Sequence, residues 1–156
     1  MKTLIACYSF TGNTLKAAES LKSEINADLI RIEPQKDTGY LAKCLNAMLK
    51  KKTPLKPCKT DLAGYDALVV CSPVWAWNAP PAVNEYLEEL RGCDGKKAAA
   101  IVTCGSSGAA GVMNKIKTEL VKKKMGFAGS VLLKEAEVQK GGYEDKVKAL
   151  AAVLKP

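Results

Sequence analysis

A run of hydroxyl and amide side chains follows the first apolar segment of the chain. The polar residues of this run are Ser9, Thr11, Asn13 and Thr14. Gly12 lies among them and allows the backbone to turn tightly. A long helical pattern follows, so the N–H groups of its first turn, at the positive end of the helix dipole, would point toward a bound anion. These residue types in this order predict a cradle for a phosphate group.

The predicted cradle carries no cation of its own. No Lys or Arg lies between Thr3 and Leu15, and neither GxxxxGK[ST] nor GxGxxG occurs in this stretch. The loop that binds nucleoside triphosphates needs its lysine for the β and γ phosphates, and the dinucleotide fingerprint needs its spaced glycines. We therefore predict a neutral cage for one terminal phosphate. The alternative is a Ser/Thr-rich turn that only caps the following helix.

The segment Ser9-Phe10-Thr11-Gly12-Asn13-Thr14 resembles the phosphate loop of flavodoxins, which hold flavin mononucleotide (FMN) by its phosphate. The resemblance implies FMN as the cofactor and three cofactor-binding loops. By position, the first loop is Ser9, Phe10, Thr11, Gly12, Asn13 and Thr14; the second is Pro73, Val74, Trp75, Ala76, Trp77 and Asn78; and the third is Thr103, Cys104, Gly105 and Ser106.

Strand and helix patterns alternate along the chain. Strands are predicted over 2–8, 28–33, 67–71, 98–103 and from 130 to 133. Helical spacing of apolar residues predicts helices around 18–25, 41–49, 83–90, 113–120 and 147–154, and residues 53–57 read as an extended linker. This alternation is typical of an α/β protein, and we predict one flavodoxin-like domain over 1–156. Its doubly wound, five-stranded parallel sheet has the order 2-1-3-4-5 with helices on both faces.

The second and third loops follow strands that end beside the first loop in this topology. The only two tryptophans, Trp75 and Trp77, both lie in the second loop, and we expect one of them to stack on an aromatic ligand. Asn78 could meet the polar edge of the ligand. The small residues of the third loop allow a flat ring to approach the backbone closely. The alternatives are two structural tryptophans and a flexible turn.

Other chemistries on this fold lack a required residue. A tyrosine phosphatase needs an arginine six positions after its cysteine, whereas Cys7 is followed by Asn13. A serine hydrolase needs a base, and the chain contains no histidine. The six cysteines form no C-x-x-C pair, so we expect no metal site, and Cys7, Cys71 and Cys104 read as small buried hydrophobes rather than redox groups. We assign no catalytic residue, because the chemistry would belong to the cofactor.

The resemblance implies a flavodoxin that transfers electrons one at a time between redox proteins. Many flavodoxins carry a Trp or Tyr in the third loop and a glycine in the second. Here the third loop has no aromatic residue and the second loop has no glycine, and these two departures leave other functions open. The first departure would suit an NAD(P)H-dependent FMN or quinone reductase, which needs an open flavin face for hydride transfer. The second leads us to expect weak stabilisation of the one-electron-reduced flavin. A non-catalytic binding module on the same fold is a further alternative.

The composition is that of an ordinary globular domain, with 47% hydrophobic and 26% charged residues among 156. The chain shows no apolar stretch long enough to span a membrane and runs from Met1 directly into a strand, so we expect a cytoplasmic protein without a membrane partner.

The net charge of +8 is concentrated in two segments. Residues 36–60 contain seven lysines and one aspartate, and residues 115–124 contain five lysines and one glutamate. We expect the first segment to attract an acidic redox partner such as a ferredoxin-like protein. The alternative is that the lysine runs are solvated helix ends, and nucleic acid is not expected because the clusters lack interleaved aromatic residues.

Overall fold

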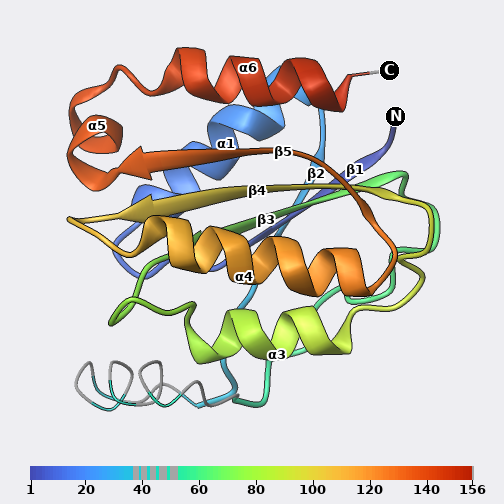
Figure 1. The fold of residues 1–156 in the computed structure, drawn as a ribbon, viewed down its shortest axis with the longest axis horizontal. Helices are drawn as coiled ribbons and strands as arrows, with labels where there is room; N and C mark the ends of the chain where they lie inside the picture. Colours follow the sequence, from blue (N-terminus) through green and yellow to red (C-terminus); the bar gives the residue numbers. More distant parts are fainter. Residues whose placement is uncertain (37–38, 40–41, 43–44, 46–48, 50–52, 156) are drawn as a thin grey trace.

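The computed structural model describes residues 1–36, 39, 42, 45, 49 and 53–155. Its strands are β1 (Thr3–Cys7), β2 (Asp28–Arg31), β3 (Ala67–Pro73), β4 (Lys97–Cys104) and β5 (Gly126–Lys134). Its helices are α1 (Asn13–Ile25), α3 (Pro81–Glu89), α4 (Ala109–Lys122), α5 (Glu135–Lys140) and α6 (Glu144–Leu154). The strands form one parallel sheet in the order β2-β1-β3-β4-β5 (Figure 1), which confirms the predicted topology.

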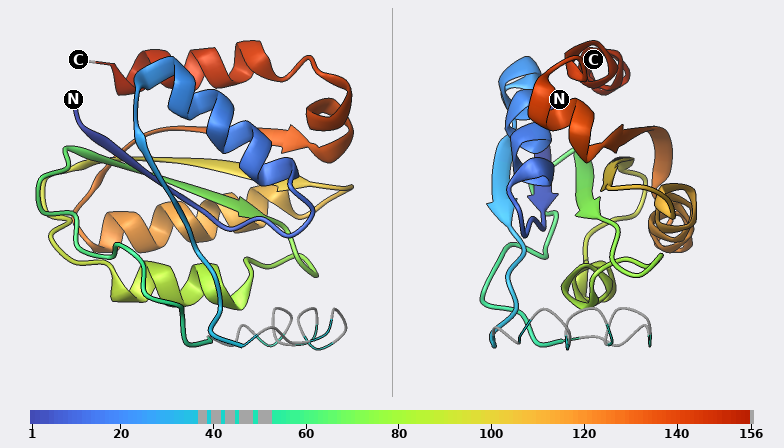
Figure 2. Two further views of the ribbon diagram at one scale, coloured as in Figure 1. Left: turned by 180° about the vertical axis from the view of Figure 1, so that it is seen from behind. Right: turned by 90° about the vertical axis from the view of Figure 1, so that its left-hand side faces the viewer.

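Helices cover both faces of the sheet. Helices α1, α5 and α6 lie on one side, and α3 and α4 lie on the other (Figures 1 and 2). Side chains of β1 alternate between the two cores, since Ile5 packs under α1 and α6 while Leu4 packs under α3 and α4. Because both faces are covered, β1 and β3 are buried along their whole length. The continuous apolar run 67–71 of β3 is typical of such a strand.

The predicted elements differ most from the observed ones at β5 and α5. Strand β5 begins at Gly126, whereas the sequence pattern placed its start at Ser130. Helix α5 was not predicted, because its six residues are too short to show helical periodicity. The predicted helix containing Leu41, Leu45, Met48 and Leu49 lies largely outside the described residues.

The segment predicted as an extended linker runs antiparallel beside the end of β2. The Gln35 N–H donates to the Pro54 carbonyl, and the Lys56 N–H donates to the Glu33 carbonyl, each at 2.8 Å. This pairing brings Lys56 next to the carboxyl end of the sheet. The carboxyl ends of β1, β3 and β4 lie together, so the three loops that follow these strands meet at one edge. None of the described helices has the length and apolar character needed to cross a membrane.

Candidate functional site

The first loop leaves the start of α1 open. Gly12 adopts a φ of 93°, and α1 begins at Asn13 with no side-chain cap and no acidic residue in its first turn, as far as the structure describes this segment. A Cβ placed on Gly12 would meet no atom within 4 Å beyond its chain neighbours. An open concavity lined by helix N–H groups is a ready site for an anion.

The polar side chains of the first loop hold its shape. The Gly12 N–H donates to Ser9 Oγ at 3.2 Å, and Asn13 Nδ2 donates to Thr11 Oγ1 at 3.1 Å. Thr14 points into the protein, where its hydroxyl lies 2.7 Å from the Thr103 hydroxyl. The sequence placed Thr14 and Thr103 in different loops of the site, and the structure brings them together below it. Direct contacts of these side chains with a phosphate stay a prediction.

One cation reaches the first loop from a neighbouring strand. Arg31, the last residue of β2, donates from Nη2 to the Ser9 carbonyl at 3.2 Å. The neutral cage predicted from local sequence therefore has a guanidinium beside it. This correction follows from the sheet order, because β2 pairs with β1 and its end must lie next to the first loop.

The second loop is a tight turn in which two residues other than glycine adopt left-handed backbone conformations. Trp75 and Asn78 exchange two backbone hydrogen bonds of 2.8 Å, and the two residues between them have positive φ values, 45° for Ala76 and 60° for Trp77. A turn with positive φ at both central positions normally uses glycine or asparagine. Asn78 Nδ2 donates to the Ala76 carbonyl at 3.0 Å, so its amide closes the turn.

The turn separates the two tryptophans. Trp75 is buried, with 8% of its surface exposed, and meets Tyr8 and Phe10 edge-on at ring centroid distances of 5.3 and 5.7 Å. Trp77 is 69% exposed, and its indole N–H donates to Ser107 Oγ at 3.2 Å. Of the two tryptophans, Trp77 is thus the one that bonds to the third loop.

The third loop packs tightly on the second. Gly108 has a φ of 89°, and a Cβ on it would lie 3.0 Å from Val74 Cγ1 and 3.1 Å from Trp77 Cδ1. Only glycine fits there without displacing one of the loops. Pro73, Thr103 and Cys104, which the resemblance placed in the site, are buried at the strand ends that support these loops.

A cavity of about 380 Å³ lies between the three loops. It is lined by Phe10, Thr11, Val74, Trp75, Ala76, Trp77, Gly105, Ser106, Ser107 and Glu135. The predicted residues Ser9, Gly12, Asn13, Thr14, Pro73, Asn78, Thr103 and Cys104 do not line it. The volume falls in the range of about 300–1,000 Å³ typical of small-molecule sites. Ser107 and Glu135 were missed, because the predicted cofactor contacts of the third loop ended at Ser106 and Glu135 belongs to the unpredicted α5.

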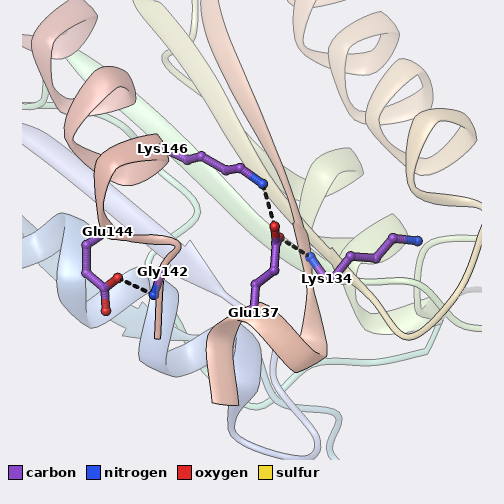
Figure 3. A network of polar contacts seen from close by, with 5 residues as sticks. All are labelled: Lys134, Glu137, Gly142, Glu144 and Lys146. Carbon is purple, nitrogen blue, oxygen red and sulfur yellow. Dashed lines mark hydrogen bonds and ion pairs between the residues drawn. The ribbon is translucent and has the colours of Figure 1, made fainter. Parts of the chain in front are cut away.

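Helix α5 is held beside the third loop by a network of polar contacts (Figure 3). Glu137 accepts from the Lys134 N–H at 3.0 Å and pairs with Lys146 Nζ at 2.8 Å. Both partners favour the charged carboxylate, so they hold the pKa of Glu137 below its ordinary value, with the Lys146 hydrogen bond the largest cause. Lys134 Nζ also donates to the Ser106 carbonyl in the third loop.

A second cavity, of about 230 Å³, lies on the other side of the first loop. Its lining residues are Tyr8, Ser9, Phe10, Arg31, Ile32, Glu33, Pro34 and Lys56. Lys56 and Glu33 form an ion pair of 2.9 Å across it, and this pairing lowers the pKa of the Glu33 carboxyl. Phe10 borders both cavities.

The cysteines near the site are packing residues in the structure. Cys7, Cys71 and Cys104 are all buried. Burial, with a smaller effect of the neighbouring Cys7, raises the pKa of the Cys71 thiol, which keeps it protonated and unreactive. Across the described residues, no group of three or more His, Cys, Asp or Glu side chains could hold a metal ion.

Comparison with known proteins identifies the family. The sequence profile described as Flavodoxin matches residues 2–141 of the chain. The chain belongs to the flavodoxin family. The expected family, with FMN as its cofactor, is thus confirmed. No curated protein matches the sequence.

Solved structures share the fold at low sequence identity. A putative flavoprotein from Bacteroides eggerthii is 23% identical with a TM-score of 0.77, and the match covers 99% of each chain. A flavoprotein in complex with FMN from Lactobacillus acidophilus is 22% identical with a TM-score of 0.71, covering 89% of this chain and 97% of that one. Two-electron reduced flavodoxin from Megasphaera elsdenii is 18% identical with a TM-score of 0.64, covering 98% and 99%.

The residues of this flavodoxin fit FMN at both ends. The open space above Gly12, beside uncapped helix N–H groups, suits a terminal phosphate. The cavity between the second and third loops offers an aromatic wall and small residues, as a flat ring requires.

Proposed function

We propose that this flavodoxin is an electron carrier that binds FMN and transfers electrons one at a time between redox proteins. The observation that carries the proposal is the hydrogen bond from the Trp77 indole to Ser107, which ties an aromatic side chain across the two loops that border the cavity. When bound, FMN supplies the redox chemistry, and the protein supplies binding, orientation and electrostatics.

The first loop would bind the phosphate. Backbone N–H groups at the start of α1 and the hydroxyl of Thr11 would donate to it, and Gly12 would leave room for it. Arg31, whose guanidinium contacts the Ser9 carbonyl, adds positive potential from outside the loop. A helix N-terminus and a nearby cation both favour a bound dianion.

The second and third loops would hold the ring. Trp75 is fixed by Tyr8 and Phe10 and forms a rigid wall of the cavity. Gly105 and Ser106 line the same cavity, and their backbone N–H groups would donate to the polar edge of the ring. Trp77 remains accessible at the rim, so the loops would exclude water from most of the ring while leaving an edge available for contact with a partner.

Trp77 also favours electron transfer over hydride transfer. A reductase needs an open flavin face on which a nicotinamide ring can stack. The sequence suggested such a face, because the third loop has no aromatic residue of its own. Trp77 lies against Gly108 and bonds to Ser107, so an aromatic side chain of the second loop borders the cavity next to the third loop and would cover part of a bound ring. Nicotinamide would have to displace it.

An acidic redox protein remains the proposed partner. In the second lysine-rich segment, residues 115–124, the last three lysines bond to nearby groups of the same chain. Lys122 pairs with Glu119, Lys124 pairs with Asp94, and Lys123 donates to the carbonyls of Glu88 and Leu90. Lys123 thus satisfies carbonyls at the end of α3, which is a structural role. The proposal therefore rests on the segment 36–60, of which Lys50, Lys51 and Lys52 lie outside the described residues.

Stopped-flow reduction tests the proposal. The protein loaded with FMN is mixed anaerobically with NADH, NADPH or a pre-reduced ferredoxin. An electron carrier is reduced rapidly by the ferredoxin and hardly at all by either nicotinamide within seconds. Fast reduction by NADPH would contradict the electron-carrier proposal and favour an NAD(P)H-dependent reductase. If the purified protein neither contains nor takes up FMN, the alternative of a non-catalytic binding module would be favoured.

A further inference from the structure

A carboxylate borders the cavity from an element outside the three loops. Glu135, the first residue of α5, is half-buried and lines the cavity together with Gly105 and Ser106. Its Oε2 lies 3.8 Å from the position that a Cβ on Gly105 would occupy. Across the lining of this cavity, Glu135 is the one formally charged side chain.

The position of Glu135 is fixed by its neighbours. Glu137 bonds to the Lys134 N–H and to Lys146 on α6 (Figure 3), so the start of α5 is tied to a second helix. The Lys134 side chain donates to the Ser106 carbonyl, which ties the same turn to the third loop. These contacts hold the backbone that carries Glu135 beside the cavity, so Glu135 borders the cavity without a movement of α5.

We propose that Glu135 sets the relative affinity of the site for oxidised and reduced FMN. This inference rests on the proposed binding of the flavin ring between the second and third loops. Reduction makes the ring more electron-rich, and a nearby carboxylate disfavours added negative charge. Glu135 therefore weakens binding of the reduced flavin relative to the oxidised flavin and makes the bound cofactor a stronger reductant. Lys134, on the other side of the same turn, acts in the opposite direction.

A purely structural role for Glu135 makes a different prediction. Acidic residues in the first turn of a helix stabilise the helix wherever they occur. Asp145, an exposed acid in the first turn of α6, lies outside the lining of the cavity. The variant D145N removes one negative charge from the first turn of another helix and is the control for E135Q.

The test measures the dissociation constants of oxidised FMN and of dithionite-reduced FMN for the wild-type protein, E135Q, K134M and D145N at one pH. Removing a unit charge at the edge of a protein changes such a ratio by about tenfold, which is about 30 mV for a two-electron couple. E135Q is expected to favour reduced FMN by this factor, K134M to shift the ratio the opposite way by a smaller factor, and D145N to leave it unchanged.

Each outcome decides between the readings. An unchanged ratio in E135Q, or equal shifts in E135Q and D145N, would overturn the role of Glu135 while leaving FMN binding intact. Equal losses of affinity for both redox forms in E135Q and K134M would indicate a structural role only. Failure of the wild-type protein to bind FMN would instead overturn the proposed function. If E135Q does not fold, E135S, which keeps a residue suited to a helix start, repeats the comparison.

Discussion

The Thr14 hydroxyl on α1 lies 2.7 Å from the Thr103 hydroxyl near the end of β4, and both residues are buried. The bond joins the first loop to the third from below, across the strand that separates them. Removing one partner leaves a buried hydroxyl without its bond, so T14V and T103V should each lower the free energy of unfolding by about 1–3 kcal/mol. The double variant, in which neither hydroxyl remains, should be nearly as stable as the wild type. Urea unfolding of the four apoproteins gives the free energies of this double-mutant cycle. If the losses of the two single variants simply add in the double variant, the two hydroxyls do not interact.

Gly12 should matter more for FMN than for folding. G12A and G64A both place a side chain at a positive φ, 93° and 80°, and both Cβ atoms would enter open space. Each should therefore destabilise the apoprotein by about 1–2 kcal/mol through backbone strain. Only G12A puts a methyl group into the predicted phosphate cradle, so only G12A should weaken FMN binding by at least tenfold in a fluorescence titration. Equal FMN affinities for the two variants would show that the phosphate does not bind at Gly12.

The two tryptophans should respond differently to replacement by alanine. W75A removes a buried ring that packs on Tyr8 and Phe10, and should cost about 3–5 kcal/mol of stability. W77A removes an exposed ring and should leave the stability within about 0.5 kcal/mol. If Trp77 covers the flavin, W77A should also bind FMN less tightly and recover part of its fluorescence. Unaltered quenching in W77A would assign the stacking to Trp75 alone.

The sequence was sufficient for the sheet and for the three loops, because both depend on local patterns. Apolar runs such as 67–71 mark strands buried on both faces, and a polar turn before a helical pattern marks the phosphate loop. The strand order then places the loops together. Phe10, Trp75 and Gly105 were predicted from this reasoning, and they do line one cavity.

The remaining features of the site depend on contacts between distant residues. Arg31 reaches Ser9 across 22 positions, and Lys134 reaches Ser106 across 28. The pair Glu135 and Glu137 after β5 is a helix-start signal, but it does not show that the helix faces the third loop. The different burial of Trp75 and Trp77 follows from a turn with two positive φ values, which Ala76 and Trp77 do not indicate in sequence.

The pKa of Glu137 should reveal whether α5 is anchored as described. Lys146 and the Lys134 N–H lower the pKa below 4.5 in the folded protein. Stability from this carboxylate is thus present above its unfolded pKa and is lost as the pH falls through the lowered folded value. In K146M the NMR titration of the Glu137 carboxyl carbon should shift upward toward 4.5, while Glu144, held by the Gly142 N–H, should not change. If Glu137 titrates identically in the wild type and in K146M, the ion pair between Lys146 and Glu137 does not form in solution.

Docking of an acidic partner should depend on the lysines of residues 36–60. Exposed charges steer association and are screened beyond a Debye length of about 8 Å at physiological salt, so the rate of electron transfer should fall steeply between low and high ionic strength. Reversal of Lys50, Lys51 and Lys52 to glutamate should lower that rate by at least tenfold at low salt and flatten its salt dependence.

The control for this reversal changes the net charge by the same amount elsewhere. Lys97, Lys148 and Lys155 are exposed and lie outside the linings of both cavities beside the first loop. Their reversal to glutamate should reduce the rate only through the change in total charge, by a factor well below that of the first triple variant. Equal effects of the two triple variants would mean that the protein attracts its partner through its overall charge, and a rate that is insensitive to salt in the wild type would mean that the lysines of residues 36–60 are a solvated surface.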